Sequence, residues 1–165
     1  MKDCIPRSAQ PLGGGRNRRA RVLGGPCQAT AAKHGHCITC NILLLPEATR
    51  VAIATNQLAD AEAYIRDLED AASRFDSQLW TASASQARGE LHAARHSWDE
   101  AGTAFRDARA VYDSVGAQYD AARCMTAEAR VLRENGGAGG EAEAARLVAQ
   151  ANDVFAALGA AGIEH

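Results

Sequence analysis

The fold of this chain is decided by the stretch RHSWDEAGTAFRDA, residues 95–108. The residues that form its apolar face are Trp98, Ala101, Phe105 and Ala108. Their offsets of 0, +3, +7 and +10 place them on one side of an α-helix. Large and small side chains alternate there, and small residues let a partner helix approach closely. The stretch therefore predicts the turn and second helix of a helical pair.

The same pattern recurs on both sides of this stretch, with offsets of 0, +4, +7, +11 and +15. The aligned sets are Ala61, Ile65, Leu68, Ala72 and Asp76; Ala101, Phe105, Ala108, Tyr112 and Gly116; and Ala144, Val148, Ala151, Phe155 and Gly159. Their first members stand at positions 61, 101 and 144, and such regular spacing indicates internal repeats. We predict an all-α fold of three stacked antiparallel helix pairs, with units at about 37–75, 77–116 and 118–160 inside a domain of residues 34–163.

The turns within the units are expected at residues 55–57, 95–97 and 135–140, where Asn and Gly supply the left-handed backbone that ends a helix. The first helices of the second and third units are expected at about 77–94 and 118–133. Leu79, Ala82, Gln86, Gly89 and Ala93 should face inward. In the first unit, either the helix starts at Pro46 or it starts near Cys37 and kinks at the proline.

Composition is that of a globular chain of 165 residues, of which 47% are hydrophobic and 23% are charged. Only 5% are aromatic, so thin contacts between alanine-rich helices must make the core. The longest apolar run, residues 42–45, is too short to cross a membrane, and no secretory signal is recognised. These features predict a cytoplasmic protein. Five cysteines without framework spacing fit reduced thiols in that compartment.

Residues 1–33 are interpreted as a flexible basic tail, because Pro and Gly interrupt them and no periodicity is present. They hold seven basic residues against one acid, a net charge of +6, which leaves −8 for the remainder. Arginines at positions 16, 18, 19 and 21 could contact nucleic acid or an acidic surface. No aromatic residue is interleaved to stack on bases, so a solvated arm is favoured and nucleic-acid binding is not expected.

One candidate metal site lies at His34, His36, Cys37 and Cys40. Thiolate and imidazole are the ligands that zinc prefers. Structural zinc sites usually draw ligands from two separated segments, and only Cys4 or Cys27 could supply a second one here. Idle or buried thiols are therefore favoured over a zinc site or a redox pair. A small zinc-binding or redox-sensing protein built on these four residues is the alternative functional hypothesis.

Together these features resemble the tetratricopeptide repeat family. The resemblance is carried by Gly89, Trp98, Ala101, Phe105 and Ala108, with a small residue in the first helix and a small-x3-aromatic-x2-small run in the second. The period is longer than is usual in that family, and Glu141 replaces the tryptophan in the third unit. The alanine- and arginine-rich style is also similar to helical repeat regions of bacterial transcriptional regulators and signalling ATPases.

This resemblance implies a protein-interaction or scaffold module with a regulatory role, without a catalytic step or cofactor, in which the first helices line a groove for a protein or peptide. The groove positions carried over from the family are Arg50, Ser83, Gln86, Glu90, Thr126 and Arg133. Separately, the last helix ends in Val154, Phe155 and Leu158 without a capping helix, which predicts self-association through these residues or a longer array.

Overall fold

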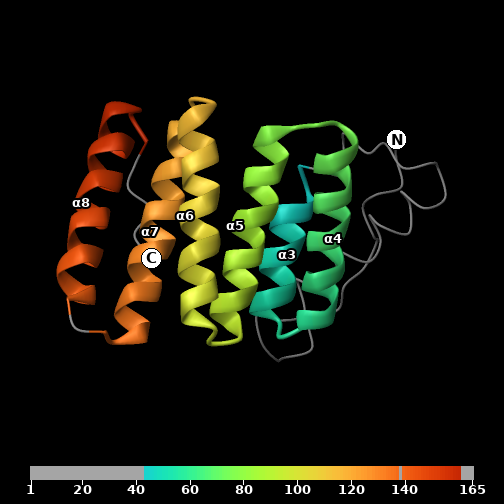
Figure 1. Ribbon diagram of the computed structural model, residues 1–165, viewed down its shortest axis with the longest axis horizontal. Helices are drawn as coiled ribbons and strands as arrows, with labels where there is room; N and C mark the ends of the chain where they lie inside the picture. The colour runs from blue at the N-terminus through green and yellow to red at the C-terminus, as the bar shows by residue number, and fades with distance from the viewer. Residues whose placement is uncertain (1–42, 138, 161–165) are drawn as a thin grey trace, which may run out of the picture.

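The computed structural model describes residues 43–137 and 139–160, in which the regular secondary structure consists of α-helices joined by short turns. Its helices are α3 (Leu45–Ala54), α4 (Leu58–Arg74), α5 (Gln78–Ala94), α6 (Trp98–Ser114), α7 (Gln118–Asn135) and α8 (Gly140–Ala157). They lie side by side along the long axis of the domain, with α3 and α4 at one end and α8 at the other (Figure 1). The prediction of an all-α fold built from antiparallel helix pairs is confirmed.

Residues outside the described part include several of the sequence predictions. They are the basic tail of residues 1–33, His34, His36, Cys37, Cys40 and the last residues of the expected domain, 161–163. Of the two starts considered for the first helix, the structure has Leu45, with Pro46 in the first turn. Pro fits there because its missing N–H would have no partner inside the helix.

The turns set a regular rhythm along the chain. Helices α4, α5, α6 and α7 begin at evenly spaced positions, 58, 78, 98 and 118. In each of these turns one left-handed residue ends the preceding helix, and the N–H of the next residue donates to the carbonyl five positions back, as in a Schellman motif. The left-handed residues that end helices in this way are Asn56, Asp76, His96, Gly116 and Gly159. Equal turns make successive helices antiparallel and similar in length.

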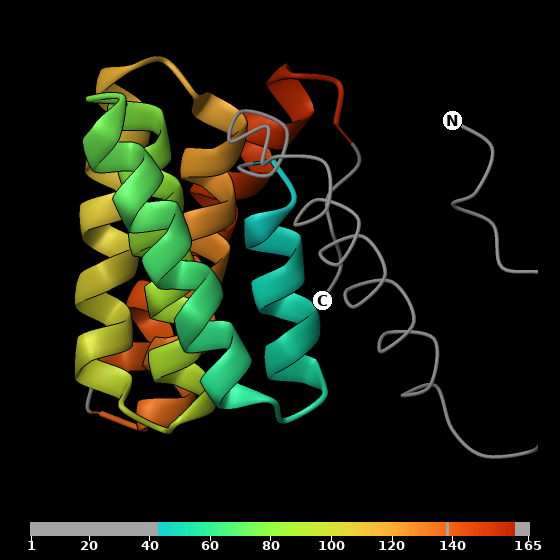
Figure 2. The same cartoon turned by 90° about the vertical axis from the view of Figure 1, so that its right-hand side faces the viewer.

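Each helix packs against the next, and the first helices of the pairs also contact one another, α3 with α5 and α5 with α7. The helices therefore form two layers. We call α3, α5 and α7 the first-helix layer and α4, α6 and α8 the second-helix layer. Viewed along the stack, α3 lies on one side and α6 on the other (Figure 2). Among the described residues no helix combines the length and apolar composition required to cross a bilayer.

The aligned positions of the three pairs are buried almost throughout. Ile65, Phe105 and Leu68 are fully enclosed, and Tyr112 and Phe155 nearly so. Val148 is half-buried, because no helix of the described residues follows α8. Leu79 is an error of the sequence prediction: its side chain is 45% exposed, whereas Ala82, Gln86, Gly89 and Ala93 are buried as expected. It lies in the first turn of α5, beyond the end of the interhelical contact.

Ion pairs of opposite polarity join the second helix of each pair to the next first helix. Between α4 and α5, Glu69 Oε1 lies 2.6 Å from Arg88 Nη2. Between α6 and α7, Arg109 Nη1 lies 3.2 Å from Glu128 Oε2, without the alignment of a hydrogen bond. Positions 109 and 128 follow positions 69 and 88 by one repeat, so the same place in the fold holds the same pair with its charges exchanged. Each ion pair thus favours the helix pairing seen in the fold, because packing these helices against the wrong neighbour would bring like charges together.

Replacing Gly89 by Ala should destabilise the domain by about 1–2 kcal/mol. A Cβ at Gly89 would lie 2.9 Å from Cε1 of Phe105, whose ring is fully buried and has no room to move. Overpacking of this kind costs about 1–3 kcal/mol, partly offset by the roughly 1 kcal/mol that Ala gains over Gly in a helix. Urea unfolding measures the difference.

Gly102→Ala is the matched control, because its Cβ would meet only the flexible end of Arg106 at 3.3 Å and Val131 at 3.9 Å. That variant should be as stable as the natural chain or more so. A second replacement, Phe105→Leu, should restore part of the stability of Gly89→Ala by making room. Equal stability of the two glycine variants would contradict the close contact.

Exchanging the charges of Arg109 and Glu128 tests the junction. Arg109→Glu would place a second carboxylate against the buried Glu128, and Glu128→Arg would bury an arginine against Arg109. Either single reversal should therefore cost about 2–4 kcal/mol. The double variant should recover at least about 1 kcal/mol relative to the sum of the singles, because the reversed pair has the polarity of the α4–α5 junction. The recovery stays partial because Arg106, which lies 3.3 Å from Glu128 Oε1 in the natural chain, then faces the new arginine. Reversing the exposed pair Glu143–Arg146 should leave unfolding unchanged. Additive single effects would contradict the interpretation.

Candidate partner-binding surface

The residues predicted to form the groove lie on all three helices of the first-helix layer. Arg50 is on α3; Ser83, Gln86 and Glu90 are on α5; Thr126 and Arg133 are on α7. The structure joins two of them directly, because Arg50 Nε donates to Glu90 Oε1 at 3.1 Å. Arg50 also pairs with Glu47 one turn away. The Arg50–Glu90 bridge connects α3 with α5, two helices that are not consecutive in the chain.

Glu90 is a half-buried carboxylate in a region with several arginines. Burial raises its pKa above the ordinary value for glutamate, and the charge and hydrogen bond of Arg50, together with the charges of Arg123 and Arg130, oppose that rise. The charged form of such a group carries a cost in desolvation that the neighbouring arginines offset in part. A charged partner that approached this surface would therefore change the pKa of Glu90, because it would add to or oppose the effect of the neighbouring arginines.

Gln86 and Ser83 are turned toward the inside of the domain. The Tyr112 hydroxyl donates to Gln86 Oε1 at 3.2 Å in a buried contact, and Ser83 also hydrogen-bonds to Tyr112. Burial raises the pKa of Tyr112 well above its usual value, so the phenol stays neutral and can donate. Gln86 is thus occupied by a bond between α5 and α6, and its amide oxygen satisfies a polar group of the core.

Thr126 and Arg133 make contacts within and next to α7. Thr126 Oγ1 donates to the Ala122 carbonyl at 3.2 Å, one turn back in the same helix. Arg133 Nε donates to Glu141 Oε1 at 3.3 Å, which joins the end of α7 to the start of α8. These two groups therefore do not take part in the Arg50–Glu90 bridge.

Arg130 is a residue that the carried-over groove positions missed. It follows Glu90 by the same interval as Glu90 follows Arg50, so the three occupy one position in successive first helices. Arg130 is exposed and makes no ion pair within residues 43–137 and 139–160. The repeat spacing alone would have found it in the sequence. Along this line an Arg–Glu bridge is followed by an exposed arginine that makes no direct ion pair among the described residues and whose charge acts on Glu90.

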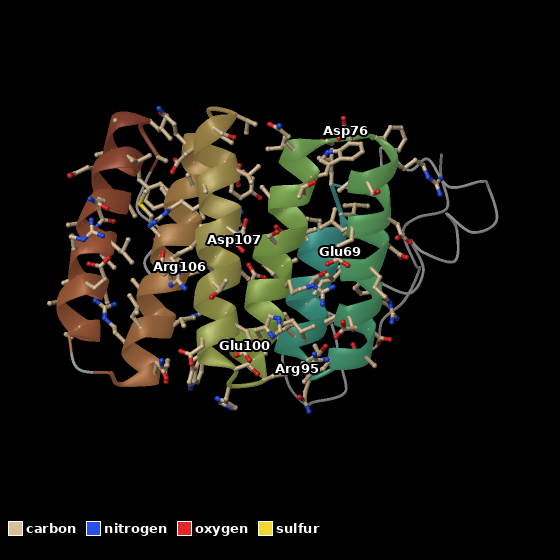
Figure 3. All side chains as sticks on the ribbon, viewed as in Figure 1. Glu69, Asp76, Arg95, Glu100, Arg106 and Asp107 are labelled. Atoms are coloured by element: carbon tan, nitrogen blue, oxygen red, sulfur yellow. The ribbon has the colours of Figure 1, made fainter. Side chains whose placement is uncertain are left out.

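The two layers differ in charge. The first-helix layer holds five acids and five arginines, whereas the second-helix layer holds twelve acids and five arginines. Glu100 and Asp107 lie on the outer side of α6, together with Asp99 around a shallow hollow (Figure 3). The net negative charge of the described domain is therefore carried by the second-helix layer, and the first-helix layer is balanced.

The alternative metal site is not described by the structure, since His34, His36, Cys37 and Cys40 lie before residue 43. Within the described residues no three His, Cys, Asp or Glu side chains are grouped so that they could hold a metal ion. Cys124 is buried, and burial raises the pKa of its thiol to about 12. At neutral pH that thiol is protonated and is a poor nucleophile.

No protein-family model, curated protein or solved structure matches the chain. The function is therefore inferred from the geometry of the chain itself.

The last helix places its three predicted self-association residues differently. Phe155 is buried, with its ring 5.5 Å from that of Tyr119 in an edge contact. Val154 is half-buried, and Leu158 is 46% exposed. Of the three side chains, that of Leu158 offers the most surface to a partner.

The Glu90→Gln variant should lose less stability than the natural chain as the pH rises. Because the folded pKa of Glu90 is raised, its contribution is full below the ordinary glutamate pKa and is lost as the pH rises through the folded value. Glutamine stays neutral, so urea unfolding between about pH 4 and pH 7 should show a smaller loss.

Glu62 provides a control of opposite sign. Burial alone would raise its pKa, but hydrogen bonds from Arg95 and Arg88 outweigh it and the pKa is lowered. Glu62 therefore contributes stability above the ordinary pKa that is lost as the pH falls. Glu62→Gln should be destabilised at neutral pH and approach the natural chain in acid. Parallel pH profiles for the two variants would contradict these assignments.

Proposed function

We propose that this chain is a protein-interaction module of the tetratricopeptide kind, whose first-helix layer receives a segment of a partner protein. The proposal is supported by helix pairs packed in sequence and by the contact of Gly89 with Phe105, in which a small residue of one helix admits an aromatic ring of the next. With helices such as α4, α5 and α6 of 17 residues each, these units are longer than the usual repeat.

The observation that carries the proposal is the line of Arg50, Glu90 and Arg130 across the three first helices. In the free protein Arg50 is paired with Glu90 and Glu47, while Arg130 makes no direct ion pair among the described residues and acts on Glu90 only through its charge. A carboxylate of a bound segment could supply that partner through a bidentate hydrogen bond. We therefore propose a partner segment of mixed polarity with an acidic side chain at this point.

A regulatory role within or beside a larger signalling or transcriptional protein is part of this proposal. It follows from the stylistic likeness of the helices to repeat regions of such proteins. We also propose a cytoplasmic setting and binding without catalysis. The buried, unpaired thiol of Cys124 is compatible with a reducing compartment.

Site-specific photocrosslinking tests the proposed surface. A photoreactive phenylalanine at position 133 should capture a protein in extracts of the producing cells, because this position borders Arg130 on α7. Position 146 on α8 is the matched control, since both arginines are exposed and pair with a glutamate. The same protein should not be captured there.

Arg130→Glu, added to the position-133 protein, should abolish that capture because it places a carboxylate against the acidic group of the partner. Capture of the same proteins from both positions would show that binding is not confined to the first-helix layer. Capture that survives Arg130→Glu would contradict the role given to this arginine. Circular dichroism checks that the variants keep their helical content.

A further inference from the structure

A row of exposed apolar side chains follows one edge of the domain. We call it the apolar edge, and it consists of Phe75, Leu79, Val115, Tyr119 and Leu158. Their exposed fractions lie between 38% and 47%. Single exposed apolar residues need no explanation, but a row of them on one side of a globular domain usually marks a contact surface.

The five residues form a row because they occupy equivalent positions at the ends of successive helices. Phe75, Val115 and Leu158 are the residues that directly follow α4, α6 and α8, and Leu79 and Tyr119 are the second residues of α5 and α7. Because successive helices are antiparallel, all these ends lie on the same side of the stack. Asp76 is seen on that side, whereas Arg95 and Glu100 lie on the opposite one (Figure 3). The opposite side has polar turns, with Asn56 and His96 at their left-handed positions.

A hollow lies among the ends of α6, α7 and α8 that are near the apolar edge. Its volume is 370 Å³. It is lined by apolar side chains beside two carboxylates, among them Ala121, Met125, Val154, Ala157, Asp113 and Asp153. Tyr119 of the apolar edge is held in place by its ring contact with Phe155. A hollow therefore lies beside the α8 end of the row, whereas at the α4 end the exposed ring of Phe75 packs against Trp80, with the ring centroids 5.3 Å apart.

The two ends of the row also carry opposite charges. Arg74 ends α4, and Asp153 lies in the last turns of α8. Both are exposed, and neither makes an ion pair within the described part of the chain. One end thus combines an exposed aromatic ring with a cation, and the other combines a hollow with a carboxylate, and neither charge has an ion pair among the described residues.

We propose that a second copy of this chain docks on the apolar edge by a two-fold axis near Val115 and Tyr119. A two-fold axis creates two identical contacts, in each of which the α4 end of one copy lies against the α8 end of the other. Phe75 of each copy then meets the hollow of the other, and Arg74 meets Asp153. This interface does not include the surface of the first-helix layer, so the test of the dimer is independent of the test of the proposed function. Of the residues expected to mediate self-association, Leu158 lies within it, Val154 lines its hollow and Phe155 supports it from below.

Sedimentation velocity of the full chain over a range of concentrations tests this arrangement. The natural chain should form dimers, and Val115→Glu at the centre of the edge should weaken them at least about tenfold. Val51→Glu is the matched control, because Val51 is an equally exposed valine on α3 away from the edge, and it should leave the dimer unchanged. A natural chain that stays monomeric, or equal effects of the two variants, would overturn the proposal.

A charge exchange tests the two-fold axis itself. Arg74→Asp alone and Asp153→Arg alone should each weaken the dimer, because each places like charges together twice. The double variant should regain the affinity of the natural chain. An equimolar mixture of the two single variants should show which ends meet. In the mixed dimer, one contact joins the two reversed residues and the other joins the two natural ones. Both contacts then pair opposite charges, so a heterodimer should form. Singles that do not weaken the dimer, or a mixture that stays monomeric, would show that these ends do not meet.

Discussion

Close approach between helices is the constraint on which the rest of this structure depends. Alanine supplies most of the buried hydrophobic positions, and each buried alanine removes little apolar area from water. Helices with so few large side chains gain enough contact only where their backbones come near each other. The ring of Phe105 packed onto Gly89 is the clearest case, because no Cβ fits between them.

Ion pairs between helices add specificity to this uniform apolar packing. Alanine-rich faces are nearly interchangeable, so apolar contact alone would allow a helix to accept the wrong neighbour. The exchanged ion pairs Glu69–Arg88 and Arg109–Glu128 oppose such errors, since a wrong pairing would place like charges together. A further bridge, Arg50–Glu90, ties the first helices to each other on one side of the domain. The remaining acids stay on the second-helix layer, where water solvates them.

Two surfaces with different properties result from the same repeat spacing. Across the first-helix layer the spacing lines up charged groups, of which Arg130 is unpaired among the described residues. Along the turns it lines up partly exposed apolar groups, such as Val115 and Tyr119. A mixed polar surface suits a peptide held by directed hydrogen bonds, and an apolar edge suits a larger, less directional contact. The two surfaces lie on different sides of the stack and do not compete.

The sequence by itself determined the helices, their pairing and their turns. The aligned apolar positions around Ala61, Ala101 and Ala144 require one buried face per helix, and residues such as Asp76 and Gly116 end each helix in the left-handed region. Only the tertiary structure decided which polar groups remain free. Gln86 and Glu90 look alike in the sequence, yet one is bonded to Tyr112 inside the domain and the other meets Arg50 across the layer. Side-chain partners on other helices depend on how the helices stack, which local periodicity does not encode.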